Sequence, residues 1–449
     1  MNLNKILDLS IFRILYLVSL SLEMIAIVCD FASIFKVLIL SFGLFVFVYN
    51  YIIKFKLLKI KFNFLILGFI FVSILTSFWN MSEDFLANLV FVYHFCLCFF
   101  IFFGMYLEKN GEKLKLEFLI VLCYLVGFAT IFSIISLIIS VPQFNIILKN
   151  HHTGIVNNRL VGIFTNANLL AFSMVISIVS CDILQDSYMK NKFYFLKKLD
   201  IFFILIKIIN IFEIFLSDSN DAFLFVVLYF IIKISYNIFS KYEKFSISRL
   251  IKGSLILVIA SSALFSVCFV FRNMCQNIIK DYLYKYVYSN INLNNSNILN
   301  NNEDMKLGRE NYDISSGRVT LMLQGIELFK INKYIGIGRA NLVNYGNKYL
   351  TPKLIFSDLH NSYLTILVSY GILGFTIFII FSVLVAVDLC KSLFQSNSSI
   401  FVKLFSLVFS YCIYAIFEKG ILSEISFIVV VFWYFLGVTC YKVYYKPIK

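Results

Sequence analysis

Long apolar blocks constrain this chain more than any other feature of its sequence. Most of them run about 17–25 residues, the length that an α-helix needs to cross the hydrocarbon core of a bilayer, and short charged stretches separate them. Spanning β-strands would alternate apolar and polar residues, whereas the block from Ile251 to Phe271 does not alternate. Hydrophobic residues make up 60% of the 449 residues, more than a soluble domain needs. The sequence therefore predicts an all-α integral membrane protein.

About twelve transmembrane helices are predicted, with one large loop between the ninth and the tenth. The loop, about 272–359, separates a region of nine helices (1–271) from a region of three (360–449). No proline falls inside a predicted span, so the sequence gives no sign of a broken helix. The predicted spans are 11–28, 34–53, 62–78, 85–107, 118–139, 162–184, 201–216, 222–238, 251–271, 363–387, 401–417 and 421–441.

Lysine and arginine gather in the short loops of one face. Two such loops run from Lys54 to Lys61 and from Lys190 to Lys198. Because these residues concentrate in cytoplasmic loops of membrane proteins, both termini are predicted to be cytoplasmic and the loop 272–359 extracytoplasmic. The same rule accounts for the net charge of +14 without nucleic acid as a partner.

Two polar segments of the predicted outer face carry arginines. Arg159 and Asn168 lie where the chain enters the sixth span, and an interfacial arginine beside a helix-capping asparagine is the simpler alternative. Arg318 follows Ser315 and Ser316 and opens a helix with apolar residues at three- and four-residue spacing, predicted to lie against the membrane surface. A helix N-terminus with an arginine fork could bind a diphosphate; the alternative is an ordinary surface arginine.

A third polar segment, Asp358 to Tyr363, enters the tenth span. Asp358 is predicted to cap that helix and to place His360 in its first turn, where the helix dipole favours a neutral imidazole that can accept a proton. A hydrogen-bonded interfacial histidine is the alternative. The histidines show no spacing typical of metal ligands and the outer loop has no compact carboxylate pair, so neither a metal nor another cofactor is expected.

These segments, in this order, resemble the family of O-antigen polymerases and O-antigen ligases, which are bacterial membrane glycosyltransferases acting on polyprenyl-diphosphate-linked sugars. The closest similarity runs from Gly317-Arg318 through Gly336-Ile337-Gly338 and the stretch from His360 to Leu364 to Gly371-Ile372-Leu373-Gly374. The segment from Arg159 to Ala171 is similar to a second family signature. The chain departs from the family where many members carry a Ser-Arg-Gly turn, because Ser217 to Asp221 contains no basic residue.

The resemblance implies an inverting, metal-independent transfer at the outer face of the bacterial inner membrane. His360 and Arg318 would be catalytic, and further residues would bind the diphosphate or glycan: Arg159, Asn168, Arg339, Asn361 and Tyr363. The expected partners are a lipid-linked oligosaccharide donor, a glycan acceptor, the bilayer, a chain-length regulator and a flippase. A repeat-unit polymerase, a ligase that transfers finished glycan to a lipid core or protein, and a lipid-linked sugar flippase all remain open at this point.

Overall fold

The computed structural model describes residues 7–54, 56–139, 147–148, 151–156, 159–189, 196–239, 317–354, 358–395 and 398–444, with a few isolated positions between 266 and 277. The chain forms two compact units. Unit 1 comprises Met1–Leu22, Phe31–Phe118 and Asp313–Lys449, and unit 2 comprises Glu23–Asp30 and Leu119–Tyr312. Most of the ninth predicted span and of the predicted loop before Gly317 lies outside the described residues.

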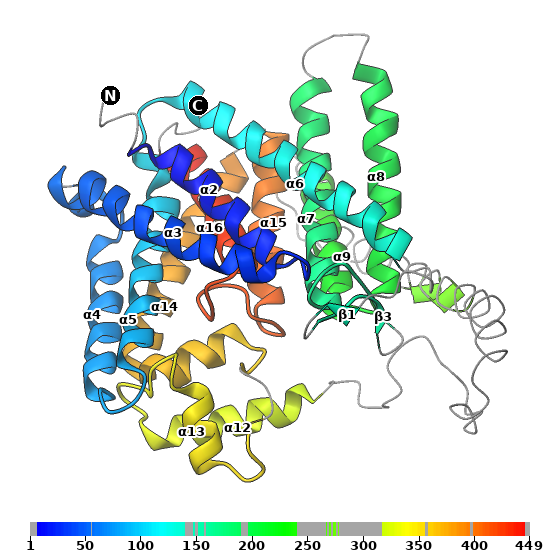
Figure 1. The fold of residues 1–449 in the computed structure, drawn as a ribbon. Coiled ribbons are helices and arrows are strands. Elements are labelled where there is room, and N and C mark those ends of the chain that lie inside the picture. The colour runs from blue at the N-terminus through cyan, green and yellow to red at the C-terminus, as the bar shows by residue number, and fades with distance from the viewer. Residues whose placement is uncertain are drawn as a thin grey trace, which may run out of the picture. The chain divides into compact units, whose positions relative to one another are not determined.

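Unit 1 is built from helices, including both ends of the described chain (Figure 1). Helix α4 packs along α5 and α14, and α16 packs against α15 and the turns that extend α5. The helices of unit 1 are α2 (Leu9–Glu23), α3 (Cys29–Phe47, extended to Ile53), α4 (Asn63–Trp79), α5 (Phe85–Cys96, extended to Leu107), α12 (Arg318–Ile331), α13 (Leu342–Tyr349), α14 (Ser362–Gln395), α15 (Ser399–Tyr414) and α16 (Phe427–Tyr444); α6 (Gly111–Ile139) begins here and continues into unit 2.

Unit 2 packs α7 (Ala167–Met189) against α8 (Leu196–Leu216) and α9 (Asn220–Phe239). Two short antiparallel pairs precede α7: β1 (Ile147–Leu148) with β2 (His151–His152), and β3 (Gly154–Val156) with β4 (Arg159–Gly162). These strands interrupt the all-helical pattern. They also correct the predicted start of the sixth span, because Gly162 ends β4 with a φ of 63° and the helix begins only at Ala167.

The apolar helices have the inside-out character of membrane proteins. Among the described helices, six are long and apolar enough to cross a bilayer, and Asn63–Trp79 and Ser399–Tyr414 are shorter apolar helices. Large apolar side chains face outward, such as Phe64 on α4, which is 83% exposed, while the charged Arg13 on α2 is fully buried. Such a surface is stable against lipid but not against water. The class predicted from the sequence, a helical membrane protein, is confirmed.

Helix α14 is broken at Gly371, contrary to the expectation of unbroken spans. Gly371 has φ 63° and ψ −172° inside the helix, without any proline. The cause is a backbone crossing: the amides of Ile337 and Gly338 donate to the carbonyls of Val368 and Ser369, at 3.1 and 2.9 Å. A Cβ on Gly336 or Gly371 would collide with the backbone of the opposite segment. The two glycine motifs noted in the sequence therefore meet each other.

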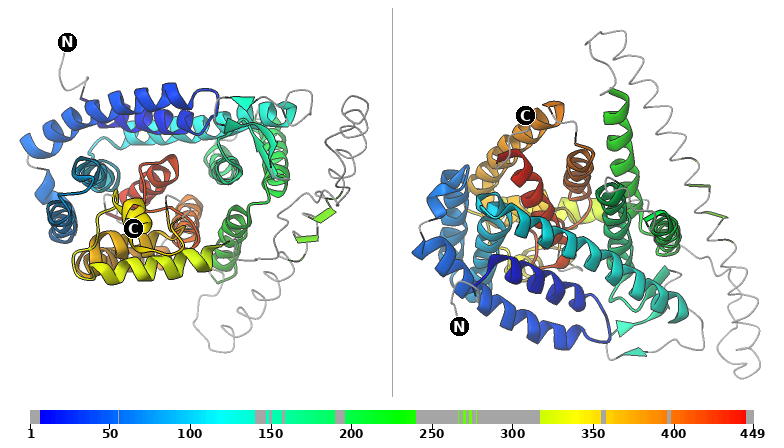
Figure 2. Two further views of the ribbon diagram at one scale, coloured as in Figure 1. Left: turned by 60° about the horizontal axis from the view of Figure 1, so that its bottom comes forward. Right: turned by 90° about the horizontal axis from the view of Figure 1, so that it is seen from above.

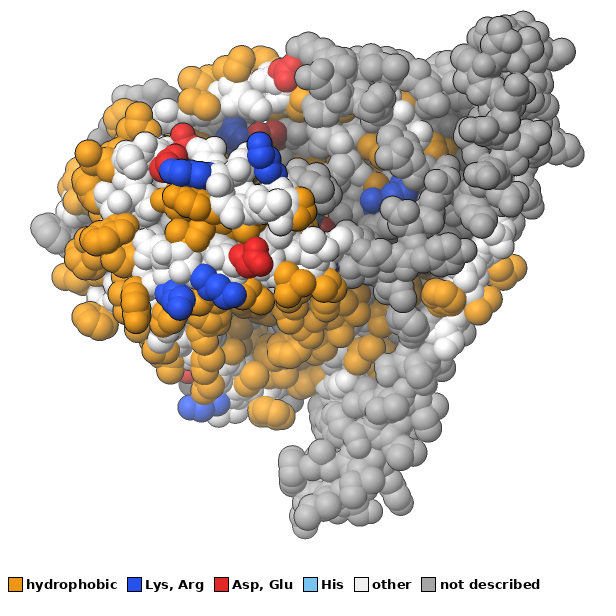
Figure 3. Space-filling model, turned by 90° about the horizontal axis from the view of Figure 1, so that it is seen from below, with side chains coloured by type: hydrophobic (Ala, Val, Ile, Leu, Met, Phe, Trp, Pro, Cys, Tyr) orange, Lys and Arg blue, Asp and Glu red, His pale blue; other side chains and the backbone are white. Residues whose placement is uncertain are grey.

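The region from α12 to the start of α14 forms a small core of its own. Helices α12 and α13 lie at one end of unit 1 (Figure 1), the end that comes forward in the left view of Figure 2. Leu321 and Leu328 of α12 are buried in it, so the helix predicted from the sequence is confirmed. The residues expected to form its apolar face toward the membrane surface, among them Val319 and Leu323, are 57% and 59% exposed. Viewed from this end, charged side chains dot the surface and hydrophobic ones gather around its edge (Figure 3).

Candidate functional site

A buried carboxylate links the two residues predicted to be catalytic. Glu418 lies in the connection between α15 and α16, and only 4% of its side chain is exposed. One carboxylate oxygen lies 3.2 Å from the Nη2 atom of Arg318, and the other lies 3.0 Å from Nδ1 of His360. Arg318 and His360, 42 positions apart in the sequence, are thus brought together by a third residue.

The Glu418 loop is tied to the start of α14 by its backbone. The Ser362 hydroxyl donates to the carbonyl of Glu418 at 3.0 Å and accepts from the amide of Gly420 at 2.6 Å. The amide of Ser362 also donates to the carbonyl of Ala415 at 2.9 Å. These bonds fix the carboxylate relative to the segment that carries His360, so the pair does not depend on two free side chains finding each other.

His360 precedes α14 in a left-handed conformation, with a φ of 47°. Asp358 supports this turn by accepting a hydrogen bond from the amide of His360 at 3.2 Å, as aspartate does in Asx turns. The predicted capping by Asp358 is wrong, because Asn361 caps α14 by accepting from the amide of Leu364 at 2.9 Å. His360 therefore lies before the cap and not in the first turn of α14, which begins at Ser362.

The charge state that the structure favours for His360 also differs from the prediction. The hydrogen bond from His360 to Glu418 raises the pKa of His360, although partial burial opposes the rise. Burial alone would raise the pKa of Glu418, but His360, Arg318 and Lys419 outweigh it and lower that pKa. The carboxylate thus favours the protonated imidazole, whereas the helix dipole was expected to favour the neutral ring. A negative charge in direct contact dominates a dipole at this distance.

Arg339 lies in the same unit, and its guanidinium is bonded to other residues of the protein. Its Nη2 atom lies 2.8 Å from Asp358, its Nε atom donates to the carbonyl of Ser423, and only 9% of its side chain is exposed. Through these bonds it holds the turn before α14 to the loop before α16. Binding of substrate by Arg339 remains a prediction.

Asn361 and Tyr363, the other predicted binding residues of this segment, have structural partners. Asn361 caps α14, as described, and the hydroxyl of Tyr363 donates to the carbonyl of Cys412 at 3.0 Å. Tyr363 is half-buried and directed between the helices. Binding of substrate by these two side chains remains a prediction.

Arg159 and Asn168 form a second group, within unit 2. Arg159, on β4, donates from Nη2 to the side-chain oxygen of Asn168 and from Nε to the carbonyl of Ser217, both at 2.7 Å. Ser217 begins the turn in which many family members carry an arginine and this chain does not. The turn thus binds Arg159 through its backbone, so the single arginine of this group is held between strand, helix and turn.

Glu418 was missed in the sequence, although it is central to the geometry. Only three residues, from Glu418 to Gly420, separate the predicted spans 401–417 and 421–441. A glutamate in so short a predicted loop was a signal, since an ionised group at the membrane edge needs a partner. Within the described part of the chain, no three His, Cys, Asp or Glu side chains are placed to hold a metal ion.

Together these features define a multi-pass helical membrane protein with an arginine–carboxylate–histidine group at one end of a helical unit. Residues 205–379 match the family model described as O-antigen ligase. This match confirms the resemblance noted in the sequence to the family of O-antigen ligases and polymerases. The matched region contains Arg318, Arg339 and His360, whereas Arg159 and Glu418 lie outside it. No curated protein matches the chain.

Proposed function

We propose that this protein transfers a glycan from a polyprenyl diphosphate to a sugar hydroxyl of another lipid-linked unit, as a repeat-unit polymerase at the outer face of the membrane. The match to the O-antigen ligase family model supports the coarser part of this proposal, a glycosyltransferase-like activity on lipid-linked glycans. The observation that carries it is the contact of one carboxylate with both Arg318 and His360. That arrangement pairs an anion-binding group with a proton acceptor.

The proposed reaction is a single displacement at the anomeric carbon. The oxygen of the acceptor hydroxyl forms a bond to this carbon while the bond to the diphosphate oxygen breaks, so the configuration inverts. The bonding electrons leave with the diphosphate, whose growing charge Arg318 stabilises. The hydroxyl proton passes to Nε2 of His360, because Nδ1 faces Glu418. Glu418 then stabilises the imidazolium that forms, as the third member of a nucleophile–base–carboxylate arrangement does.

A ligase is the second candidate, because the matching family model carries the description O-antigen ligase. Donor and chemistry are shared between the two activities, and only the acceptor differs. A flippase is less well supported, since it would need polar groups along a path to both faces, whereas Arg318, His360 and Glu418 gather in one place.

A deletion strain separates these functions. Loss of a polymerase should leave single repeat units transferred or accumulated on the lipid, whereas loss of a ligase should leave long chains on the lipid carrier. Loss of a flippase should leave repeat units inaccessible from outside. Unchanged glycan in the deletion strain would refute all three. For the purified protein, we expect transfer from a lipid-linked repeat unit to proceed in excess EDTA, and activity restored only by magnesium would refute metal independence.

A further inference from the structure

A buried glutamate of unit 2 has a carboxyl oxygen without a partner. Glu213 lies on α8, and its side chain is fully buried. The hydroxyl of Ser133 on α6 donates to its Oε1 atom at 2.7 Å, whereas the Oε2 atom has no hydrogen-bond partner among the described residues. No ion pair within the described part of the chain includes Glu213 either. The carboxyl is therefore enclosed in protein without a counter-ion.

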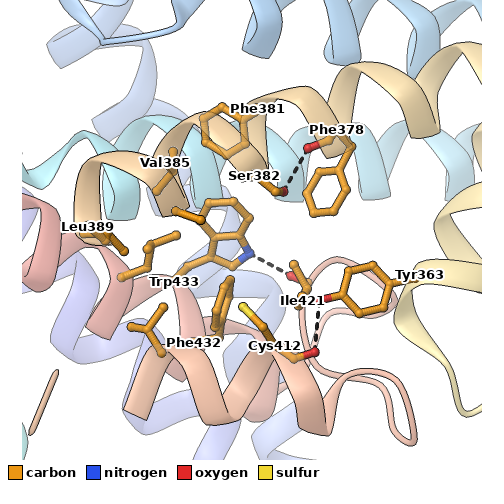
Figure 4. A pocket seen from close by; sticks show the side chains of 13 residues that line it. Tyr363, Phe378, Phe381, Ser382, Val385, Leu389, Cys412, Ile421, Phe432 and Trp433 are labelled. Carbon is orange, nitrogen blue, oxygen red and sulfur yellow. Dashed lines mark hydrogen bonds between the residues drawn. The ribbon is translucent and has the colours of Figure 1, made fainter. Parts of the chain in front are cut away.

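Buried polar side chains of unit 1 show the contrast. Arg13 on α2 is fully buried and donates to both carboxylate oxygens of Glu117, at 2.7 Å each. In the apolar pocket between α14, α15 and α16, the indole of Trp433 donates to the carbonyl of Ile421 at 2.7 Å (Figure 4). An ionised carboxylate that is buried without a cation is very costly. The surroundings of Glu213 thus suit the neutral acid and not the anion.

Asn210 supplies the acceptor that a neutral acid needs. Asn210 and Glu213 lie three positions apart on α8, so their side chains share one face of the helix. The amide nitrogen of Asn210 donates to the hydroxyl of Ser177 on α7 at 2.8 Å, and its Oδ1 atom has no partner among the described residues. Two such oxygens attract each other only with a hydrogen between them. A proton on Oε2 of Glu213 provides that hydrogen.

Two helices connect Glu213 to Arg159. On α8, the carbonyl of Glu213 accepts from the amide of Ser217 at 2.8 Å, and the carbonyl of Ser217 accepts from Arg159 at 2.7 Å. On α6, one turn beyond the serine that binds Glu213, the hydroxyl of Ser136 accepts from the amide of Ile163, directly after β4, at 3.2 Å. The helices that enclose the carboxyl thus also hold the strand and the turn that position Arg159.

We propose that Glu213 is a proton-binding site and that its proton keeps the Arg159 group in place. Loss of the proton would leave an unpaired negative charge between α6 and α8 and disturb both connections to Arg159. The effect on substrate rests on the proposed function, in which Arg159 is expected to bind the diphosphate or glycan. The charged side chains of the neighbouring elements lie to either side along α8: Arg159, Asp218 and Asp221 toward its end, and Asp182, Asp186, Lys207 and Lys233 toward its start.

Infrared spectroscopy of the full-length protein in detergent tests the proton directly. At neutral pH the wild type should show the carbonyl band of a protonated carboxylic acid, which Glu213→Gln should lose and alkaline solution should remove. Glu424→Gln is the matched control and should keep the band, because Glu424 is paired with Lys419 at 2.8 Å. Glutamine can make both hydrogen bonds of the neutral acid, so Glu213→Gln should fold as the wild type does. A spectrum that Glu213→Gln leaves unchanged, or a Glu213→Gln protein that does not fold, would overturn the proton site.

The KM for a lipid-linked repeat unit tests the connection to Arg159. Above the pH at which the band disappears, the KM of the wild type should rise about 10-fold with little change in kcat, the order of one lost hydrogen bond to a charged group. The KM of Glu213→Gln should stay constant over the same range. Equal KM values in the two proteins at every pH would overturn the connection. If the wild type transfers no glycan at any pH, the proposed function fails, whereas the infrared band still decides the proton site.

Discussion

At the scale of single residues, Glu418 determines the charge of the candidate site. It contacts Arg318 and His360 at once, so one negative charge is shared by a permanent cation and a titratable ring. An anionic diphosphate that approaches Arg318 competes with Glu418 for the same guanidinium. Binding of the donor would therefore leave Glu418 more fully paired with His360, which makes the imidazole a stronger base when the acceptor arrives.

The first prediction concerns the pH dependence of transfer. His360 must be neutral to accept a proton, and Glu418 raises its pKa, so kcat/KM should rise with pH through a value above the ordinary one of about 6.5. In Glu418→Gln the negative charge is lost, the pKa of His360 falls, and the acid limb should move to lower pH. At pH values above the acid limbs of both proteins, Glu418→Gln should be about 10- to 100-fold slower than the wild type, which is part of what general base catalysis contributes.

Glu424→Gln is the matched control, because Glu424 lies in the same loop but pairs with Lys419 at 2.8 Å. Its acid limb should coincide with that of the wild type. An acid limb that stays in place in Glu418→Gln, or moves to higher pH, would show that His360 is not the titrating base.

The second prediction concerns the two residues that Glu418 joins. Arg318→Ala should reduce turnover roughly 100- to 1000-fold, the usual loss for one electrostatic contact to a transition state. Arg318→Lys keeps the charge but loses the fork, so it should be impaired less. His360→Ala should lose about 100- to 10,000-fold. Chain-length distribution of the glycan, with membrane abundance alongside, measures these effects, and normal glycan at normal abundance in all variants would reject the site.

At the scale of elements, the third prediction concerns the place where the backbone segments of Gly336 and Gly371 cross. Gly336→Ala and Gly371→Ala each add a Cβ at positive φ that collides with the carbonyl of Ser369 or Tyr334. Both should destabilise the protein by roughly 2–5 kcal/mol, from the left-handed conformation and the steric overlap together. Gly317→Ala is the control, with a φ of 78° but open space around the new Cβ. In detergent, the unfolding temperature of Gly317→Ala should be well above those of the other two variants.

The elements also show what sequence could and could not predict. Each predicted span in the described part of the chain overlaps a helix, because long apolar blocks leave no other way to satisfy the backbone in lipid. The break at Gly371 was missed, since it depends on a segment more than 30 positions away and not on a local breaker. The cap of α14 was also misplaced, because Asp358 and Asn361 are both good capping residues and only tertiary contacts decide between them.

At the scale of the whole molecule, the family was predictable and the full site was not. Arg318, His360 and the glycine motifs lie in one stretch, where their order carries the resemblance. Glu418 lies 58 residues beyond His360, and its contact arises from the packing of the loop before α16 against the start of α14. No periodicity encodes such a contact. The number of spans and the side of the membrane on which the site lies remain predictions.

The final prediction tests that side directly. Lys348 on α13 is 60% exposed and lies close in sequence to the site, whereas Lys54 is exposed in a predicted cytoplasmic loop. In a variant whose 10 native cysteines are replaced, Lys348→Cys should react with a membrane-impermeant thiol reagent in cells with an intact inner membrane. Lys54→Cys should react only after that membrane is opened, because lysine-rich loops stay in the cytoplasm. The opposite pattern would place the candidate site in the cytoplasm, where the proposed acceptor at the outer face could not reach it.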